Sequence, residues 1–255
     1  MIFGLLIGAA VGVSAGYLGS LMVLRKMALV GDAMSHVALL GLALGLIFHF
    51  PAFIGAFAVL FVSAIVIWHL GRVTKLSLES IVSASFTLAL AIGILMIGDK
   101  LELLESLFGD ITNVTLLDAL AAVIISIVAI FLTRAIYQKL VLGMISEDLA
   151  VSKGISVSRV DLLYLLLISL VVAAGIKIVG SLLVGFLVAV PAASAKNVGS
   201  NLLRYAVLSS VFGAVSATSG VLLSNSLNIQ YVGPMVVVSG ITIFAVTIVM
   251  RWKAK

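Results

Sequence analysis

Residues 2–24 read IFGLLIGAAVGVSAGYLGSLMVL, an apolar run of 23 residues that is followed directly by Arg25 and Lys26. A helix that rises about 1.5 Å per residue needs roughly 20 such residues to cross a hydrocarbon layer about 30 Å thick. The length of the run and the cations behind it predict a retained membrane helix rather than a cleaved signal peptide. This stretch therefore predicts an integral membrane protein.

The rest of the chain has the same character. Hydrophobic residues make up 63% of the 255 residues, charged residues make up 10%, and the mean hydropathy is +1.36, whereas soluble domains carry about 25% charged residues. We predict an all-α integral membrane protein: a polytopic helical bundle in one domain, residues 1–255, with about nine transmembrane helices. The apolar stretches lie at 2–24, 27–48, 52–70, 80–98, 116–137, 161–175, 177–195, 203–224 and 233–250.

The count depends on 161–195, where two short crossings would share 35 residues and turn near Ala173, Ala174 and Gly175. Eight crossings is the alternative. An odd count places the two termini on opposite sides of the membrane, and an even count places them on the same side.

The loop cations indicate the orientation of the chain. If nine segments cross, only Lys100 and Lys177 of the fifteen cations fall on one side. Because cytoplasmic loops carry an excess of Lys and Arg, the N-terminus is expected outside and the C-terminus in the cytoplasm of a cell membrane. The net charge of +5 then needs no nucleic-acid partner. The cytoplasmic cations are Arg25, Lys26, Arg72, Lys75, Arg134, Lys139, Lys153, Arg159, Lys196, Arg204, Arg251, Lys253 and Lys255.

Small residues predict close helix packing. Glycines recur every four residues in the first segment, at Gly4, Gly8, Gly12 and Gly16. This spacing places them on one face, where another backbone can approach closely. Gly41 and Gly45 are expected to act in the same way in the second segment.

The second segment also carries the one acidic residue that lies well inside a predicted crossing. Asp32 and His36 are four residues apart, with Ser35 beside them, so the carboxylate and the imidazole share a helical face. A charge inside the membrane costs several kcal/mol unless it is paired, hydrated or used, roughly 2.5 to 3.5 on insertion scales. On the expected helix the pair lies close to the midplane.

The pair by itself is compatible with three interpretations. The two side chains could hydrogen-bond to each other or to a neighbouring helix, they could relay protons, or they could supply half of a transition-metal site. Carboxylate oxygen and imidazole nitrogen suit zinc, manganese or iron. The absence of cysteine argues against a thiolate site.

A polar cytoplasmic loop is predicted at 138–160, and within it a short helix that a glycine ends. The helix carries Glu147, Asp148, Leu149, Ala150, Lys153 and Gly154. Such a helix on the cytoplasmic face could bind a motor protein, or it could be a connector. The chain has no phosphate-binding loop and no other catalytic motif, so an enzyme is not expected.

Several motifs, in order along the chain, resemble those of one known family. The run MALVGDAMSHVALLGLA at 27–43 is similar to the motif of the permeases of zinc and manganese ABC importers, the ABC-3 family, with its core at Gly31 to His36. Further similar stretches are SLESI at 77–81, EDLAVSKGI at 147–155, VGSLLVGFLVAVPAASA at 179–195 and GVLLS at 220–224. The resemblance spans nearly the whole chain.

The resemblance implies a permease subunit that moves zinc, manganese or iron into the cytoplasm and has no intrinsic cofactor. The implied partners are a second copy of the permease, cytoplasmic ATPase subunits that bind ATP, an external metal-binding protein and the lipid bilayer. The helix at 147–155 would be the coupling helix. Asp32 and His36 would be metal ligands, with Ser35, Glu79 and Asn228 as further candidates. A proton-coupled secondary transporter or channel that uses Asp32 and His36 as a relay is the alternative, and a membrane assembly protein without transport is a third.

The chain departs from the family pattern at two places. Leu40 precedes Gly41 where the family has a proline, and Asn228 and Gln230 stand where it has an aspartate followed by proline. The missing late charge weakens any transfer of metal selectivity. The choice among zinc, manganese and iron stays open, because carboxylate and imidazole serve all three.

Overall fold

The computed structural model describes residues 2–253 apart from 75, 97–106, 110–113, 182–183 and 230, and this part of the chain contains helices and no strands. The helices are α1 Ile2–Leu24, α2 Ala28–Ile47, α3 Ala52–Val73, α4 Leu78–Met96, α6 Leu116–Ile145, α7 Glu147–Ser152, α8 Val157–Val179, α9 Val184–Val198, α10 Leu202–Ser226 and α11 Val232–Lys253. Within the described ranges, eight of them are long and apolar enough to cross a membrane. The predicted all-α polytopic membrane bundle is confirmed.

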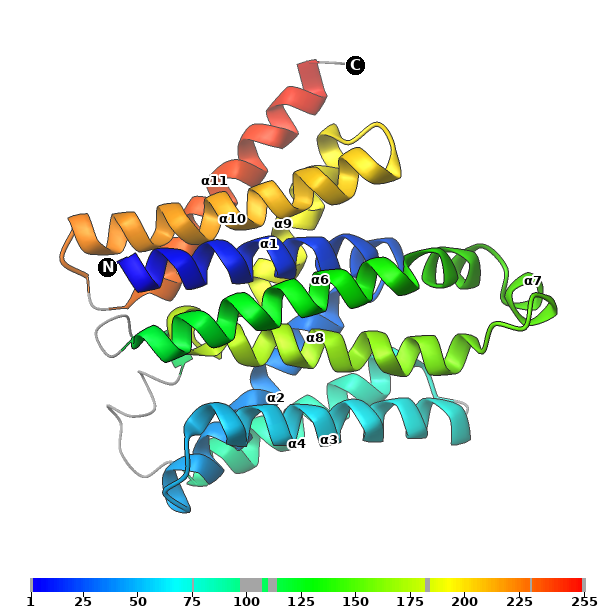
Figure 1. Ribbon diagram of the computed structural model, residues 1–255, viewed down its shortest axis with the longest axis horizontal. Helices are drawn as coiled ribbons and strands as arrows, with labels where there is room; N and C mark the ends of the chain where they lie inside the picture. Colours follow the sequence, from blue (N-terminus) through cyan, green and yellow to red (C-terminus); the bar gives the residue numbers. More distant parts are fainter. Residues whose placement is uncertain are drawn as a thin grey trace.

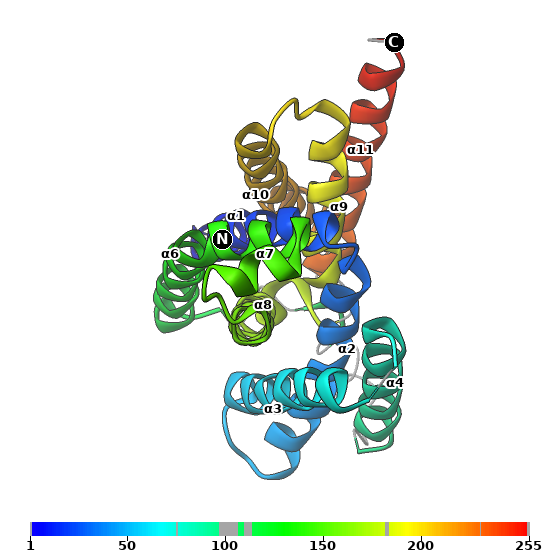
Figure 2. The same ribbon diagram turned by 90° about the vertical axis from the view of Figure 1, so that its right-hand side faces the viewer.

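The ninth apolar helix is α9, which has 15 residues and extends over only about 22 Å at 1.5 Å per residue. It packs among α1, α2, α10 and α11 in the interior of the molecule. Figure 2 shows it above α2, with α3 and α4 below. The two predicted segments of 161–195 are therefore one full-length helix, α8, and one short one.

The predicted turn at Ala173, Ala174 and Gly175 is wrong, because α8 continues through these residues to Val179. They serve helix packing instead: a Cβ on Gly175 would lie 2.3 Å from Cγ2 of Val184, at the start of α9. The break comes at Gly180, whose φ of +84° and ψ of 160° suit glycine alone.

The polar loop predicted at 138–160 is shorter than expected. Helix α6 runs on to Ile145 and α8 already begins at Val157, so only residues 146–156 lie between the two long helices. The predicted apolar stretch ends at 137, just before Gln138 and Lys139. The helix continues because its extension packs: Leu140 is fully buried.

Helix α1 is the central element, between α10 and α6 in Figure 1. Its glycines account for this position. A Cβ on Gly12 would lie 2.4 Å from the carbonyl oxygen of Gly213, and one on Gly16 would lie 2.2 Å from that of Ser209. Ser209 also donates a hydrogen bond of 2.5 Å to the Gly16 carbonyl. The predicted packing face of α1 is confirmed at these positions.

Helix α2 packs on α3 through glycines in the same way. A Cβ on Gly41 would lie 2.3 Å from the carbonyl oxygen of Gly55, and one on Gly55 would lie 2.2 Å from that of Gly41. The two backbones therefore touch where the sequence predicted close packing. This contact fixes the half of α2 that lies beyond Asp32 and His36.

Candidate metal site

The local fold at the start of α2 positions the Asp32 and His36 pair. Lys26 adopts a φ of +59°, and the Met27 N–H donates to the Met22 carbonyl oxygen at 2.9 Å. These features make the turn that ends many helices in a left-handed residue. Helix α2 begins immediately after it, at Ala28.

The pair lies in the first half of α2. Asp32 is the fifth and His36 the ninth of its 20 residues, so they lie about 6 and 12 Å along the helix from its first residue. His36 is closer to the middle of the helix.

Helix α9 presses directly on the backbone of α2 at Asp32. A Cβ on Gly185 would lie 2.5 Å from the Cα of Asp32 and 3.0 Å from the carbonyl oxygen of Gly31. A Cβ on Gly31 would in turn lie 3.0 Å from Cγ1 of Val188. These two glycines let a short helix support the backbone that carries the carboxylate.

Helix α4 supports the pair from another side. The rings of His36 and Phe86 lie 5.5 Å apart between centroids and are tilted by 33°. The His36 side chain is 13% exposed. Its Nδ1 is buried and finds no hydrogen-bond partner in the described part of the chain, which leaves Nε2 as the nitrogen on the side of Asp32.

The two side chains are close but do not form a hydrogen bond. Nε2 of His36 lies 3.9 Å from Oδ2 of Asp32, whose side chain is 53% exposed. A hydrogen bond would need about 2.7 to 3.2 Å. Two ligands about 2.1 Å from a tetrahedral ion lie about 3.4 Å apart, so a small rotation would bring both atoms onto one ion. Among the described residues, no lysine or arginine forms an ion pair with Asp32.

Ser35 lies beside the pair, and its hydroxyl is used within the helix. The Oγ donates a hydrogen bond of 2.6 Å to the carbonyl oxygen of Asp32, and the residue is fully buried. In this conformation the hydroxyl stabilises the local backbone. The Ser35 oxygen could bind a metal ion only through its lone pairs.

Glu79 and Asn228 lie elsewhere on the fold. Glu79 is exposed in the first turn of α4, and no group of three or more Asp, Glu, His or Cys side chains suited to a metal occurs within the described ranges. Asn228 is exposed in the turn after α10, with a φ of +53°, and the Ile229 N–H donates to Ser224 O at 2.9 Å. This turn explains an asparagine here, since asparagine tolerates the left-handed conformation. Gln230 lies outside the described residues.

One feature of α4 was missed in the sequence. Helix α4 exposes the hydroxyl residues Ser80, Ser83 and Thr87, which line a shallow groove with Ala84, Leu88 and Ala91. The hydroxyls recur at intervals of three and four residues, which is the helical period. That spacing in an otherwise apolar segment was the signal that could have identified a polar face on α4.

The short helix α7 is present as predicted between α6 and α8. Ser146 caps its start by accepting from the Leu149 N–H at 3.2 Å. Gly154, with a φ of +75°, and Ile155 close its end by donating to Val151 and Ala150 carbonyl oxygens at 2.9 and 3.0 Å. Figure 1 shows α7 at the opposite end of the molecule from the N-terminus.

The candidate coupling residues of α7 differ in their accessibility. Glu147, Asp148, Leu149, Lys153 and Gly154 are exposed. Ala150 is fully buried, so it holds the helix against the molecule and has no surface to offer a partner.

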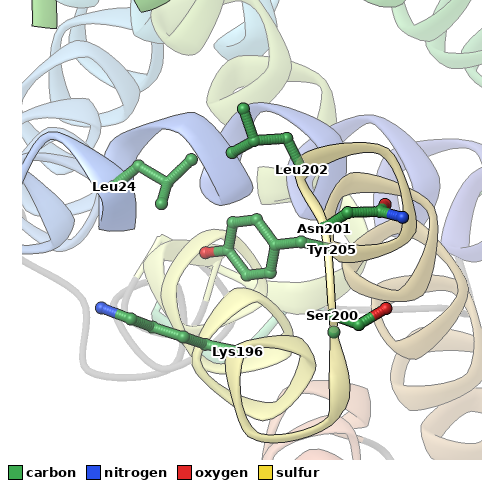
Figure 3. Close-up of a pocket in the computed structure, with 7 residues that line it drawn as sticks. Leu24, Lys196, Ser200, Asn201, Leu202 and Tyr205 are labelled. Carbon is green, nitrogen blue, oxygen red and sulfur yellow. The ribbon is translucent and has the colours of Figure 1, made fainter. Parts of the chain in front are cut away.

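A separate hollow opens where α1 and α9 end and α10 begins (Figure 3). It has no carboxylate or imidazole among its lining residues, so it lacks the donors of the α2 pair. Asn201 caps α10 by accepting from the Arg204 N–H at 2.8 Å, and the Tyr205 ring packs against Ala192 and Ala195. The lining residues are Leu24, Lys196, Gly199, Ser200, Asn201, Leu202 and Tyr205.

Comparisons with known proteins agree with this architecture. The model of the ABC 3 transport family matches residues 1–251. The chain is 30% identical to the manganese transport system membrane protein MntC of Listeria monocytogenes, with 94% of this chain and 87% of the relative covered. It is 29% identical to the high-affinity zinc uptake system membrane protein ZnuB of Buchnera aphidicola, over 96% and 95% of the two chains.

A solved structure has the same fold. The similar chain belongs to PsaBC from Streptococcus pneumoniae in complex with Fab, with a TM-score of 0.84 and 29% sequence identity. The match covers 96% of this chain and 89% of the other.

Proposed function

Because this chain belongs to the ABC 3 transport family, we propose that it is the permease subunit of an ATP-driven importer that carries a divalent transition-metal ion into the cytoplasm. It is a multi-pass membrane protein of a cell membrane. ATP would be hydrolysed by a separate chain, because this sequence has no phosphate-binding loop.

The observation that carries the proposal is the Asp32 and His36 pair. A carboxylate that is 53% exposed on a membrane helix would cost roughly 2.5 to 3.5 kcal/mol if lipid surrounded it. The α2 surface around it is therefore expected to face a second copy of the permease or a hydrated path. Because two protein donors hold an ion weakly, the ion can both enter and leave, as conduction requires.

The chemistry of the pair limits the cargo to a class. One carboxylate and one imidazole suit zinc, manganese and iron, and the chain has no cysteine for softer ions. The names of the relatives refer to manganese and zinc, so these two are the first cargoes to test. Iron is the third.

Each of the two ends of the molecule is proposed to bind a different partner. The exposed candidate coupling residues Glu147, Asp148, Leu149, Lys153 and Gly154 form the surface proposed to receive the ATPase. Glu147 and Asp148 lie in the first turn of α7, where negative charge is favourable, and Leu149 adds an exposed apolar contact. An external metal-binding protein is proposed to deliver the ion at the opposite end.

The test is uptake of radioactive zinc or manganese into vesicles that contain the permease and its ATPase. Asp32→Asn and His36→Ala are expected to lower uptake about tenfold or more, the scale expected when a metal loses a supporting group. His69→Ala is the matched control, because His69 is an exposed histidine near the end of α3. Normal uptake in both site variants would overturn the assigned roles, and uptake that needs no ATP would overturn the importer.

A further inference from the structure

A partly buried polar cluster joins three helices at the end of α1. Arg25 forms an ion pair with Asp161 of α8, and its Nη2 donates to the carbonyl oxygen of Leu140 of α6 at 3.5 Å. Its guanidinium carbon lies 6.0 Å from the centroid of the Tyr164 ring. The Arg25 side chain is 8% exposed and that of Asp161 is 36% exposed. We call these four residues the Arg25 cluster.

The cluster is fixed in place on the α1 side as well. Tyr164 is fully buried, and its hydroxyl donates a hydrogen bond of 2.6 Å to the carbonyl oxygen of Leu18. The ring under the guanidinium is therefore attached to α1 itself. A charged side chain with two defined acceptors and a defined ring face has one preferred position, which makes the contact specific rather than a loose surface pair.

The contacts of Arg25 lie on both helices that carry α7. Leu140 is five residues before the end of α6, and Asp161 is four residues after the start of α8. The two helices also pack directly there, since a Cβ on Gly143 would lie 3.3 Å from Cγ1 of Val157. Figure 1 shows α7 at the tip of this pair of helices. A push on α7 would therefore move the acceptors of Arg25.

Arg25 is also adjacent to the helix that holds the candidate ligands. Only Lys26 and Met27 separate it from α2, and the turn they make is closed by backbone hydrogen bonds. Asp32 follows seven residues after Arg25. A displacement of the α6 and α8 ends would thus reach the start of α2 through one short, defined turn.

A second polar contact connects the same end of α8 to α2 by another route. The Trp68 indole N–H of α3 donates to Ser158 O at 2.7 Å, and Ser158 is the second residue of α8. Helix α3 then meets α2 at the contact between Gly55 and Gly41. Both routes start beside α7 and end on α2.

We propose that Arg25 and Asp161 are positioning residues that couple the movement of α7 to the metal-binding half of α2. The proposal rests on the proposed function, because it assigns the link between the ATPase contact and the ion site. Neither residue touches the ion. The role of the pair is to hold the start of α2 to the two helices that an ATPase would move.

The experiment measures ATP hydrolysis and metal uptake in the same vesicles, with the permease and its ATPase reconstituted together. Asp161→Asn keeps the size of the side chain but removes its charge. Arg25→Lys keeps the positive charge but removes the guanidinium group. Both variants are expected to assemble and to hydrolyse ATP, while the ATP consumed per ion rises about tenfold, a usual coupling factor. Asp161→Glu keeps the carboxylate, so its ATP consumption per ion is expected to lie close to that of the wild type.

The matched control is Arg159→Gln, which removes an exposed cation two residues from Asp161 on α8 and should leave the ratio unchanged. An unchanged ratio in both pair variants would overturn the inference, and so would a parallel loss of hydrolysis and uptake or a failure of both to assemble. Absence of ATP-dependent uptake in the wild-type complex would instead refute the proposed function.

Discussion

At the scale of single residues, the sequence identified the α2 pair but not what holds it. The spacing of Asp32 and His36 placed both on one helical face without any knowledge of the fold. The role of Gly185 depends on α9 crossing α2 at Asp32, a tertiary contact that no local pattern reports. From the sequence, the Asn228 side chain is a candidate metal ligand. In the structure, the left-handed backbone of Asn228, with a φ of +53°, already explains why an asparagine occupies this position.

The contact at Gly185 gives the residue-scale prediction. Gly185→Ala places a methyl group 2.5 Å from the Cα of Asp32, so α9 must move away from α2. We expect a loss of about 1 to 3 kcal/mol in the free energy of unfolding, as overpacking usually causes, together with reduced metal uptake. Thermal unfolding in detergent and vesicle uptake measure the two effects.

Gly71→Ala is the control for this variant. Among the described residues, a Cβ on Gly71 would meet only Cδ1 of Leu78, at 3.9 Å, so alanine fits there and should leave the stability unchanged or raise it by up to about 1 kcal/mol. If Gly185→Ala behaves like Gly71→Ala, the close contact between α9 and α2 does not exist in the protein.

At the scale of helices, the sequence predicted the existence of the apolar helices better than their ends. Helix α6 has 30 residues and is about 45 Å long, which exceeds a hydrocarbon layer of about 30 Å. We therefore expect its last turns, which carry α7, to extend beyond the hydrocarbon layer. Lys139 lies in this extension. Hydropathy predicts the end of a membrane segment at such a charge, but the helix itself continues past it.

Helix α7 gives the prediction at this scale. Gly154 ends it with a φ of +75°, and no atom of the described residues lies within 4 Å of where its Cβ would be. Gly154→Ala is therefore strained only by its backbone, by about 1 to 2 kcal/mol. We expect α7 to fray and the ATPase to bind more weakly, while the membrane helices keep their stability.

The affinity of the detergent-solubilised permease for its ATPase, measured by titration, checks this expectation. Gly154→Asn is the companion variant, because asparagine tolerates the left-handed conformation and should bind more tightly than alanine does. Equal binding by the glycine, asparagine and alanine forms would show that the end of α7 has no part in the contact.

At the scale of the whole molecule, the short helix α9 decides the number of membrane crossings. Figure 1 shows the end of α10 near the N-terminus at one end of the molecule, and α7 at the other. If α9 crosses, nine segments span the bilayer, and the connection between α9 and α10 lies on the α7 side. The structure places that connection on the α7 side, because Ser200 lines one hollow with Leu24 at the end of α1, and the neighbouring Arg25 contacts the α6 and α8 ends beside α7. Eight crossings would move the connection and the C-terminus to the other side. The cations near the connection, Lys196 and Arg204, favour the cytoplasmic side and hence nine crossings.

Cysteine labelling decides the count cleanly, because the chain has no cysteine of its own. Single cysteines are placed at three exposed sites: Ser152→Cys in α7, Ser200→Cys between α9 and α10, and Trp252→Cys near the end of α11. With nine crossings, all three react with a membrane-impermeant maleimide only after the cells are permeabilised, and Phe3→Cys reacts in intact cells. With eight, Ser200→Cys and Trp252→Cys react in intact cells while Ser152→Cys stays protected. Since α9 supports Asp32 through Gly185, nine crossings would also mean that the shortest crossing is the one that holds the candidate ligand in place.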